Sequence, residues 1–198
     1  MEDLLKNNNF IDDIRTLINE ARKQVVHTVN TVMVATYWEI GRRIVEEEQN
    51  GNERAEYGKY LIKNLAEALT ADFGKGFGET NLKYFRQFYQ TFPIRHTLRD
   101  GLSWSHYRLL MRVVNEETRT FYLNEAIECA WSVRQLERQI SSFYYQRLLA
   151  SQNKGIVKKE AEQNNAPITP SEVLKDPYAV NRTVIELYAL TDTDRTGA

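Results

Sequence analysis

The sequence comprises 198 residues with 26 basic and 27 acidic side chains, which gives a formal net charge of -1. Its single cysteine excludes an internal disulfide, no Cys/His cluster has zinc-binding spacing, and no apolar run approaches the ~18 residues of a membrane span. Residues 1–6 carry acids where a signal peptide carries bases. We therefore expect a cytoplasmic protein of one domain plus an appendage, with no metal, no other cofactor and no membrane contact.

The near-zero net charge conceals segments of opposite sign. Residues 75–112 hold seven bases and two acids, and residues 132–159 hold six bases and one acid. Residues 31–56 and 160–198 are acidic instead. Such asymmetry is typical of a surface that binds a polyanion, although solvated helix faces of mixed sign explain it equally well.

The first predicted element is a long helix over residues 10–49. Side chains of one mostly apolar face recur along it at spacings of three or four, and they are Ile11, Ile14, Ile18, Ala21, Val25, Val29, Val32, Thr36 and Ile40. A periodic run of this length exceeds a typical globular helix and favours extended packing or self-association. A homodimer through this helix is therefore one expected assembly, and Gly41 marks either close packing or a break.

A helix-turn-helix is predicted next. Helices over residues 58–73 and 79–92 flank residues 74–78, where three of five residues are glycine and indicate a tight turn. In this motif the second helix buries one face and presents the other to a DNA major groove. The alternative is an ordinary pair of bundled helices with a solvated outer face.

Residues 79–92 separate into two faces when they are placed at 100° intervals around a helix. The apolar face consists of Leu82, Phe85, Phe88, Tyr89 and Phe92. The residues expected to contact DNA lie on the outer face, its flank and the preceding turn, and they are Lys75, Thr80, Lys83, Tyr84, Arg86, Gln87 and Gln90. Lysine and arginine suit phosphates or guanine, and glutamine suits adenine. Asn81 falls on the apolar side, where we expect it to bond to the turn.

A fourth helix, predicted over residues 103–114, adds Arg108 and Arg112 to the expected DNA contacts. These arginines form a narrow polar stripe one turn apart. They suit a phosphate backbone, and they could equally pair with Glu116 or Glu117 on the next turn.

Two further helices are predicted to begin at the capping residues Asn115 and Ser132 and to run to about residues 130 and 150. Residues 151–170 are polar without periodicity and are predicted to be a linker, followed by an unstructured tail. The chain is therefore expected to be mainly α, with a helical DNA-binding domain over residues 1–150 and a linker and tail over residues 151–198.

No catalytic constellation is recognisable in the sequence. No Glu-x-Lys occurs, so the carboxylate-lysine core of a PD-(D/E)XK nuclease is missing, and the glycines of residues 74–78 lack Walker spacing. His27, His96, His106 and Cys129 are scattered without the logic of a triad. We expect His106 to be packed in the core and Cys129 to be a small core residue. No catalytic and no metal-binding residue is expected.

Several motifs, in one order along the chain, resemble those of the YhcG-like family. They are YWEIGRRI at 37–44, GFGETNL at 76–82, RQFY at 86–89, LSWSHY at 102–107, ECAWSVRQLE at 128–137 and KDPY at 175–178. The resemblance covers roughly residues 10–180. It implies the N-terminal helical domain of bacterial proteins often found beside restriction-modification and phage-defence genes. It also implies DNA binding through a helix-turn-helix or winged-helix arrangement, with a PD-(D/E)XK nuclease domain following.

The sequence departs from the family pattern after residues 175–178. It continues with Ala179 and ends at Ala198, so the nuclease domain is expected to be absent and no catalytic residue carries over. We expect a DNA-binding module, itself not an enzyme, whose partners are duplex DNA, a second copy or a defence-complex subunit. The alternative is a helical oligomerisation or protein-interaction scaffold of a defence complex that makes no direct DNA contact.

Overall fold

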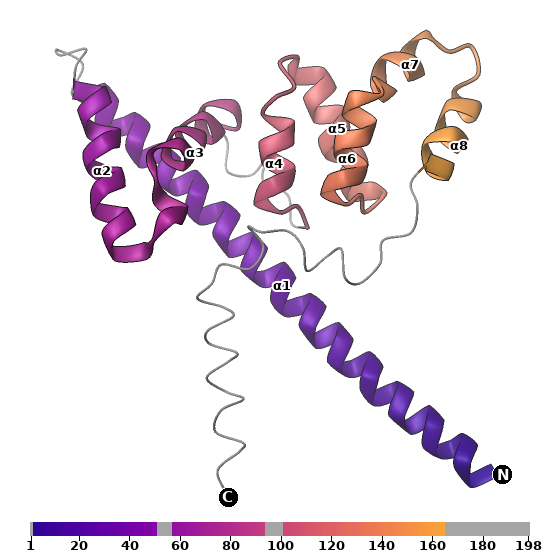
Figure 1. Ribbon diagram of the computed structural model, residues 1–198. Helices are drawn as coiled ribbons and strands as arrows, with labels where there is room; N and C mark the ends of the chain where they lie inside the picture. Colours follow the sequence, from indigo (N-terminus) through magenta and orange to yellow (C-terminus); the bar gives the residue numbers. More distant parts are fainter. Residues whose placement is uncertain (1, 51–56, 94–100, 165–198) are drawn as a thin grey trace, which may run out of the picture.

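The computed structural model describes residues 2–50, 57–93 and 101–164. In chain order the helices are α1 (Glu2–Asn50), α2 (Tyr57–Phe73), the 3-10 turn η1 (Lys75–Phe77), α3 (Glu79–Thr91), α4 (Trp104–Leu110), α5 (Glu116–Glu128), α6 (Val133–Ser141), α7 (Tyr144–Ala150) and α8 (Lys154–Asn164) (Figure 1). These three ranges contain no strand, which confirms the mainly α class and leaves the wing of a winged helix without a counterpart there. No helix in the described parts combines the length and apolar character that a membrane span requires.

The long helix α1 is continuous, as predicted, although it begins at Glu2 rather than at residue 10. Only its second half packs into the body, by which we mean the packed set of helices α2 to α8. Val34, Trp38 and Ile44 in that half are buried at spacings of four and six. Figure 1 shows the first half extending away from the other helices. Gly41 lies where α3 crosses α1, and a Cβ atom at this position would collide with the backbone of Phe85. Gly41 therefore marks close packing rather than a break.

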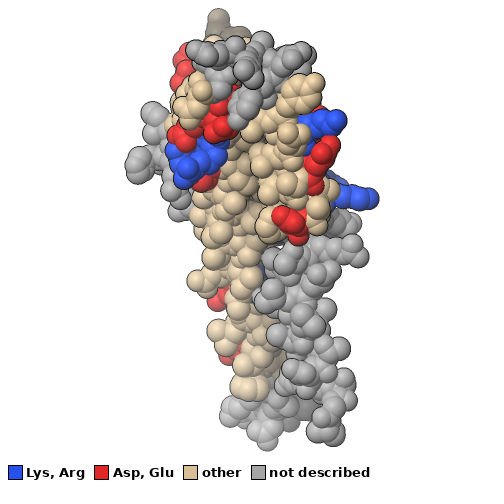
Figure 2. Space-filling model, turned by 90° about the vertical axis from the view of Figure 1, so that its left-hand side faces the viewer, with Lys and Arg blue, Asp and Glu red and all other residues tan. Residues whose placement is uncertain are grey.

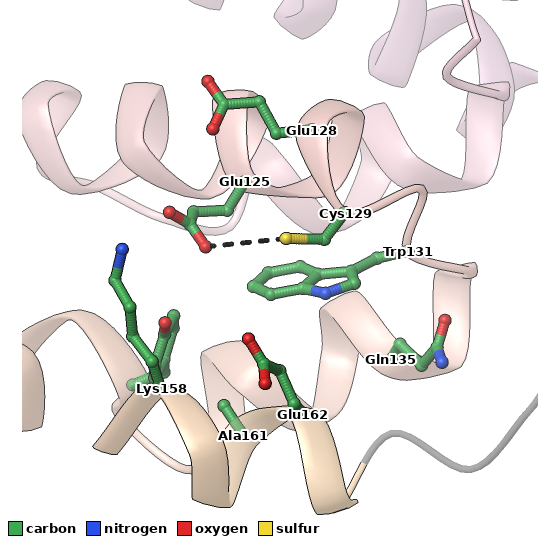
Figure 3. Close-up of a pocket in the computed structure, with 9 residues that line it drawn as sticks. Glu125, Glu128, Cys129, Trp131, Gln135, Lys158, Ala161 and Glu162 are labelled. Atoms are coloured by element: carbon green, nitrogen blue, oxygen red, sulfur yellow. Dashed lines mark hydrogen bonds between the residues drawn. The ribbon is translucent and has the colours of Figure 1, made fainter. Parts of the chain in front are cut away.

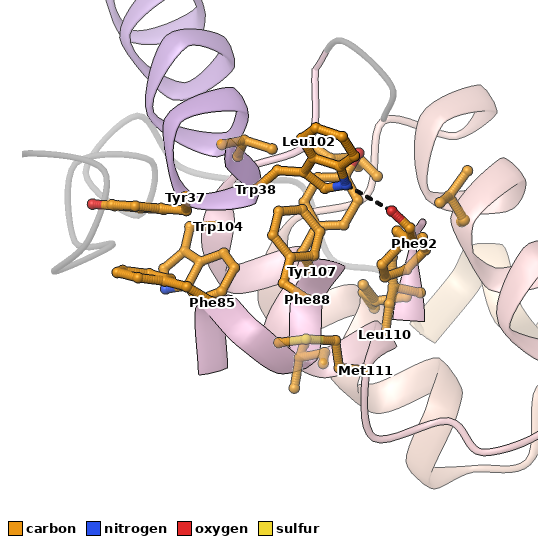
Figure 4. Close-up of a cluster of buried hydrophobic side chains, with 14 of the residues drawn as sticks. Tyr37, Trp38, Phe85, Phe88, Phe92, Leu102, Trp104, Tyr107, Leu110 and Met111 are labelled. Carbon is orange, nitrogen blue, oxygen red and sulfur yellow. Dashed lines mark hydrogen bonds between the residues drawn. The ribbon is translucent and has the colours of Figure 1, made fainter. Parts of the chain in front are cut away.

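An aromatic cluster joins α1, α3 and α4 into one core (Figure 4). The rings of Tyr37 and Phe85 stack with centroids 4.3 Å apart and an interplanar angle of 9°. Trp104 of α4 packs against both rings, with centroids 5.2 Å away. Trp38 Nε1 donates a hydrogen bond to the Phe92 carbonyl oxygen at 2.7 Å, so this buried indole has its polar partner. The cluster holds α3 rigidly between α1 and α4.

The predicted caps at Asn115 and Ser132 are confirmed. Asn115 Oδ1 accepts from the Thr118 N–H at 2.8 Å, and Ser132 forms a capping box with Gln135. The cap of α4 is made by a histidine, since the Ser103 N–H donates to His106 Nδ1 at 3.1 Å. His106 Nε2 bonds to the Trp131 carbonyl oxygen at 2.9 Å, so this buried histidine is packed as expected and carries its proton on Nε2.

The single helix predicted from residue 132 to 150 is wrong, because the chain breaks into α6 and α7. Phe143 at the break has a φ of 53°, in the left-handed region. The Tyr122 hydroxyl stabilises the break by donating to the Gln139 carbonyl oxygen at 3.1 Å and accepting from the Tyr145 N–H at 3.2 Å. The turn lets Tyr144 become buried, a gain from tertiary packing that periodicity within the segment does not reveal.

Two other boundaries also differ from the prediction. The helix expected over residues 103–114 ends at Leu110, because Arg112 and Val113 form tight i to i-3 hydrogen-bonded turns. Part of the expected linker over residues 151–170 is the helix α8. Its Ala161 is buried, and Gln139 Nε2 donates to the Ala161 carbonyl oxygen at 3.4 Å. A small apolar contact is sufficient to hold this segment as a helix, because α7 already provides a surface against which α8 packs.

Candidate nucleic-acid interface

The predicted helix-turn-helix consists of α2, η1 and α3. Gly74 ends α2 with a φ of 86°, a conformation that favours glycine. Asn81 Nδ2 donates to the Gly76 carbonyl oxygen at 2.9 Å, which confirms its expected bond to the turn. This bond fixes the beginning of α3 relative to α2.

The two faces of α3 are those that the sequence predicts. Leu82, Phe85 and Phe88 are at most 1% exposed, and Phe92 follows them into the core. The exposed side chains on the opposite face are Thr80, Lys83, Gln87 and Gln90. Tyr84 is half-buried among them. The structure therefore brings four of the candidate DNA contacts together on one solvent-facing surface.

The charge of Lys83 is offset on this surface by an acid one turn earlier. Lys83 Nζ lies 2.7 Å from the Glu79 carboxylate, and this hydrogen bond lowers the pKa of Glu79 below its ordinary value. The two side chains are 56% and 45% exposed, so the pair is weak and its lysine can exchange partners with a phosphate.

Arg86 on the flank of α3 is held by α1. Its Nη1 lies 2.8 Å from the carboxylate of Glu48, whose side chain is only 21% exposed. The Arg86 Nε atom is buried without a hydrogen-bond partner. The structure thus gives Arg86 a role in fastening α3 to α1, and the sequence could not reveal this because the partner is 38 residues away.

The basic stripe of α4 adjoins the outer face of α3. The guanidinium carbon of Arg108 lies 4.5 Å from the centroid of the Tyr84 ring, a cation–π contact between the two helices. Arg112 is exposed one turn further on. Within the described part of the chain, no ion pair joins Arg112 to Glu116 or Glu117, the alternative partners considered from the sequence.

The candidate bases lie in a part of the molecule where charges of both signs are present. Lys75 is exposed in the turn before α3. On the face shown in Figure 2, Lys and Arg side chains of the upper body lie beside Asp and Glu side chains. Two bases of the first basic segment, Arg95 and Arg99, lie outside the described residues. The candidate surface is therefore polar and moderately basic, formed by α3 and α4.

Comparison with known proteins gives the family. The sequence matches the family described as the DUF1016 N-terminal domain over residues 13–147. The chain belongs to this family. It is also similar to an Escherichia coli (strain K12) protein titled "Putative nuclease YhcG", with 36% identity over 213 aligned positions that cover 91% of this chain and 56% of that protein. The resemblance to the YhcG-like family is thus confirmed. No solved structure matches the chain.

The family match covers every candidate DNA contact, because Lys75 through Arg112 lie within residues 13–147. The chain spans about half the length of the curated relative that it matches. The chain is therefore related to the N-terminal domain of this family. A protein named as a putative nuclease is among its relatives.

A separate pocket of about 320 Å³ lies where α5, α7 and α8 meet (Figure 3). Its lining residues are Glu125, Glu128, Cys129, Trp131, Gln135, Tyr144, Lys158, Ala161 and Glu162. Burial raises the pKa of Glu125, and burial with the neighbouring carboxylates raises that of Cys129. Three carboxylates around one lysine make this pocket unsuitable for a polyanion.

The prediction that Cys129 is a core residue is wrong, because the residue is exposed at the rim of this pocket. It follows α5 directly, where the chain turns toward α6. The sequence contained no signal for the pocket, because its far wall is α8, a segment predicted to be a linker.

Proposed function

We propose that this chain is a DNA-binding module and that duplex DNA lies across the outer surfaces of α3 and α4. The observation that carries the proposal is the contact between Arg108 and Tyr84, at 4.5 Å. This contact joins the outer face of α3 and the basic stripe of α4 into one surface. In a helix-turn-helix, this is where the recognition helix meets the groove and an adjacent helix meets the backbone.

The residues divide into two roles on this proposal. Gln87 and Gln90, exposed on α3, face base edges, for which a side-chain amide offers both a donor and an acceptor. Lys83, Arg108 and Arg112 face phosphates. Arg86 supports α3 from the side through Glu48 and is assigned no base contact.

The setting follows the family resemblance. We place the module in the cytoplasm, within a restriction-modification or phage-defence system, and assign catalysis to no residue of this chain. A metal-dependent nuclease assay on the chain is expected to show only background cleavage. The alternative scaffold function predicts no DNA affinity at any salt concentration.

The test is binding of a fluorescently labelled duplex, measured by anisotropy over a series of salt concentrations. The wild-type affinity should fall steeply with salt, with about one unit of logarithmic slope for each phosphate contact. The variant Lys83→Ala/Gln87→Ala/Arg112→Ala should bind at least ~10-fold more weakly, with a slope about two units smaller. Arg86 is left intact so that Glu48 keeps its partner.

A matched control removes the same charges and one amide elsewhere. The variant Gln146→Ala/Lys154→Ala/Lys159→Ala changes exposed residues of α7 and α8 and should bind like the wild type. Equal losses in the two triple variants would show that only overall charge matters and would refute the α3–α4 surface. Absence of binding by the wild-type chain at low salt would refute DNA binding itself.

A further inference from the structure

The two halves of α1 carry apolar residues for different purposes. In the second half, the buried residues are Val34, Tyr37, Trp38, Gly41, Ile44 and Val45. In the first half, every residue from 9 to 25 is exposed. The second half is thus a core helix of the body, whereas the first half has no described element packed against it.

The exposed half nevertheless carries large apolar side chains. Ile18 is 49% exposed and Val32 is 57% exposed, and Ile11, Ile14 and Val25 are 38–40% exposed. Figure 2 shows this part as a narrow column with few charged side chains on the visible face. A helix that projects into water gains no stability from such residues, because an apolar face stabilises a helix only when it packs against another element.

These side chains follow the seven-residue repeat of a coiled coil. Ile11, Ile18, Val25 and Val32 recur every seven residues and form the a positions, and Ile14, Ala21 and Thr28 form the d positions. We call these seven residues the heptad row. The Thr28 hydroxyl donates to the Gln24 carbonyl oxygen at 2.9 Å, so its polar atom already has a partner within the helix.

The heptad row lies on the side of α1 opposite to the body. At 100° per residue, the mean direction of the row is roughly 180° from that of the buried residues of the second half. An apolar face that served only the body would continue on the same side of the helix. The change of side therefore leaves room for a second helix along residues 11–32 without a collision with the body.

We propose that the heptad row pairs with the heptad row of a second copy of this chain in a parallel, two-stranded coiled coil. All four a positions are β-branched, as in parallel two-stranded coiled coils, and Ile14 is the one isoleucine among the d positions, whereas assemblies of three or more strands carry isoleucine at both a and d. Because each body lies on the outer side of its own α1, two bodies fit at the same end of the paired helices. The inference does not depend on DNA binding, since none of the candidate DNA contacts lies within residues 11–32.

The charged residues beside the row set the direction of pairing. Arg15 and Arg22 both occupy e positions. An antiparallel pair would bring Arg15 of one copy beside Arg22 of the other, and like charges would repel. A parallel pair places each arginine beside a g position, where Phe10 and Leu17 offer apolar surface to the arginine stem.

The mass of the chain in solution, measured by sedimentation equilibrium over a range of micromolar concentrations, tests the pairing. We expect twice the mass of a single chain for the wild type. Val25→Asp should give the mass of a single chain at the same concentrations, with the body still folded by circular dichroism. The matched control His27→Asp adds the same aspartate on the polar side and should keep the doubled mass. A wild-type monomer would overturn self-pairing and assign the row to another protein, and a trimer or larger assembly would overturn the two-stranded arrangement.

The direction is tested with one cysteine near the end of the row. In a Cys129→Ser background, Ile14→Cys should form a disulfide between two copies on mild oxidation, because a parallel pair places the two d positions opposite each other. A doubled mass without this cross-link would overturn the parallel direction, because an antiparallel pair places residue 14 near residue 25 of the other copy.

Discussion

Gly41 of α1 lies so close to α3 that a Cβ atom added to it would come within 2.0 Å of the Phe85 carbonyl oxygen and 2.7 Å of the Phe85 carbonyl carbon. Both neighbours are backbone atoms, so no side-chain rotation relieves the collision. Phe85 also stacks on Tyr37, one turn before Gly41. The glycine therefore sets the distance between the helix that carries the body and the proposed recognition helix.

Substitution Gly41→Ala is expected to destabilise the protein by about 1–3 kcal/mol, because α1 and α3 must move apart and lose packing. Urea unfolding followed by circular dichroism measures this change. The control is Gly155→Ala in α8, where the nearest atom to the new Cβ is a flexible side-chain oxygen of Asn153 at 3.3 Å. The control should be neutral or stabilising by up to about 1 kcal/mol, since alanine has the higher helix propensity. Equal effects of both changes would contradict the close approach.

Loss of the Arg86 side chain should reveal its structural role. Arg86→Ala leaves Glu48, 21% exposed, without its 2.8 Å partner, and we expect a loss of about 1–2 kcal/mol in the free energy of unfolding. Lys83→Ala breaks an exposed pair and should leave the unfolding midpoint nearly unchanged. Thermal and urea denaturation of both variants measure the two losses of stability. A Lys83 variant as unstable as the Arg86 variant would mean that the two ion pairs are equivalent.

The ion pairs of Glu39 should contribute a pH-dependent part of the stability. Arg42 and Arg43 hydrogen-bond to Glu39 and lower its pKa from 4.5 to about 2. A lowered pKa in the folded state contributes stability that is fully present above pH 4.5 and is lost as the pH falls toward about 2. The contribution is small, because the Glu39 side chain is 41% exposed.

Glu39→Gln is the variant that measures this contribution. Its urea midpoint should lie below that of the wild type at pH 7, and the gap should close between pH 4.5 and 2. Glu67→Gln on α2, whose Lys63 partner is 4.0 Å away, is the control for loss of an exposed carboxylate. A gap that stayed constant down to pH 2 would rule out the ion pairs as its cause.

Phe143 holds a strained backbone at the break between α6 and α7. Its φ is 53° and its side chain is 64% exposed, so Phe143→Gly removes the strain with little loss of packing. We expect stabilisation by up to about 1 kcal/mol. Leu149→Gly, at a similarly exposed position inside α7, should instead destabilise by about 1 kcal/mol. Differential scanning calorimetry measures both, and destabilisation by Phe143→Gly would disprove the strain.

Much of the candidate interface could be predicted from the sequence, because the information was local. The apolar spacing of Leu82, Phe85 and Phe88 determines which face of α3 is buried, and the remaining positions must face outward. Asn81 follows the glycine turn, so its bond to Gly76 also depends only on residues close in the sequence. Partners distant in the chain were not predictable, as the contact of Arg108 with Tyr84 shows.

The sequence by itself determined the helical class, the caps at Asn115 and Ser132, and the polar face of α3, because each depends on residues within one or two turns. Only the tertiary structure decided that α1 divides into a core half and an exposed half. Both halves carry apolar residues at helical spacing, and only the position of α3 and α4 shows which side of the helix is already covered. The tertiary structure likewise placed Arg86 against Glu48 and made α8 a helix, because those contacts join segments that no local rule connects.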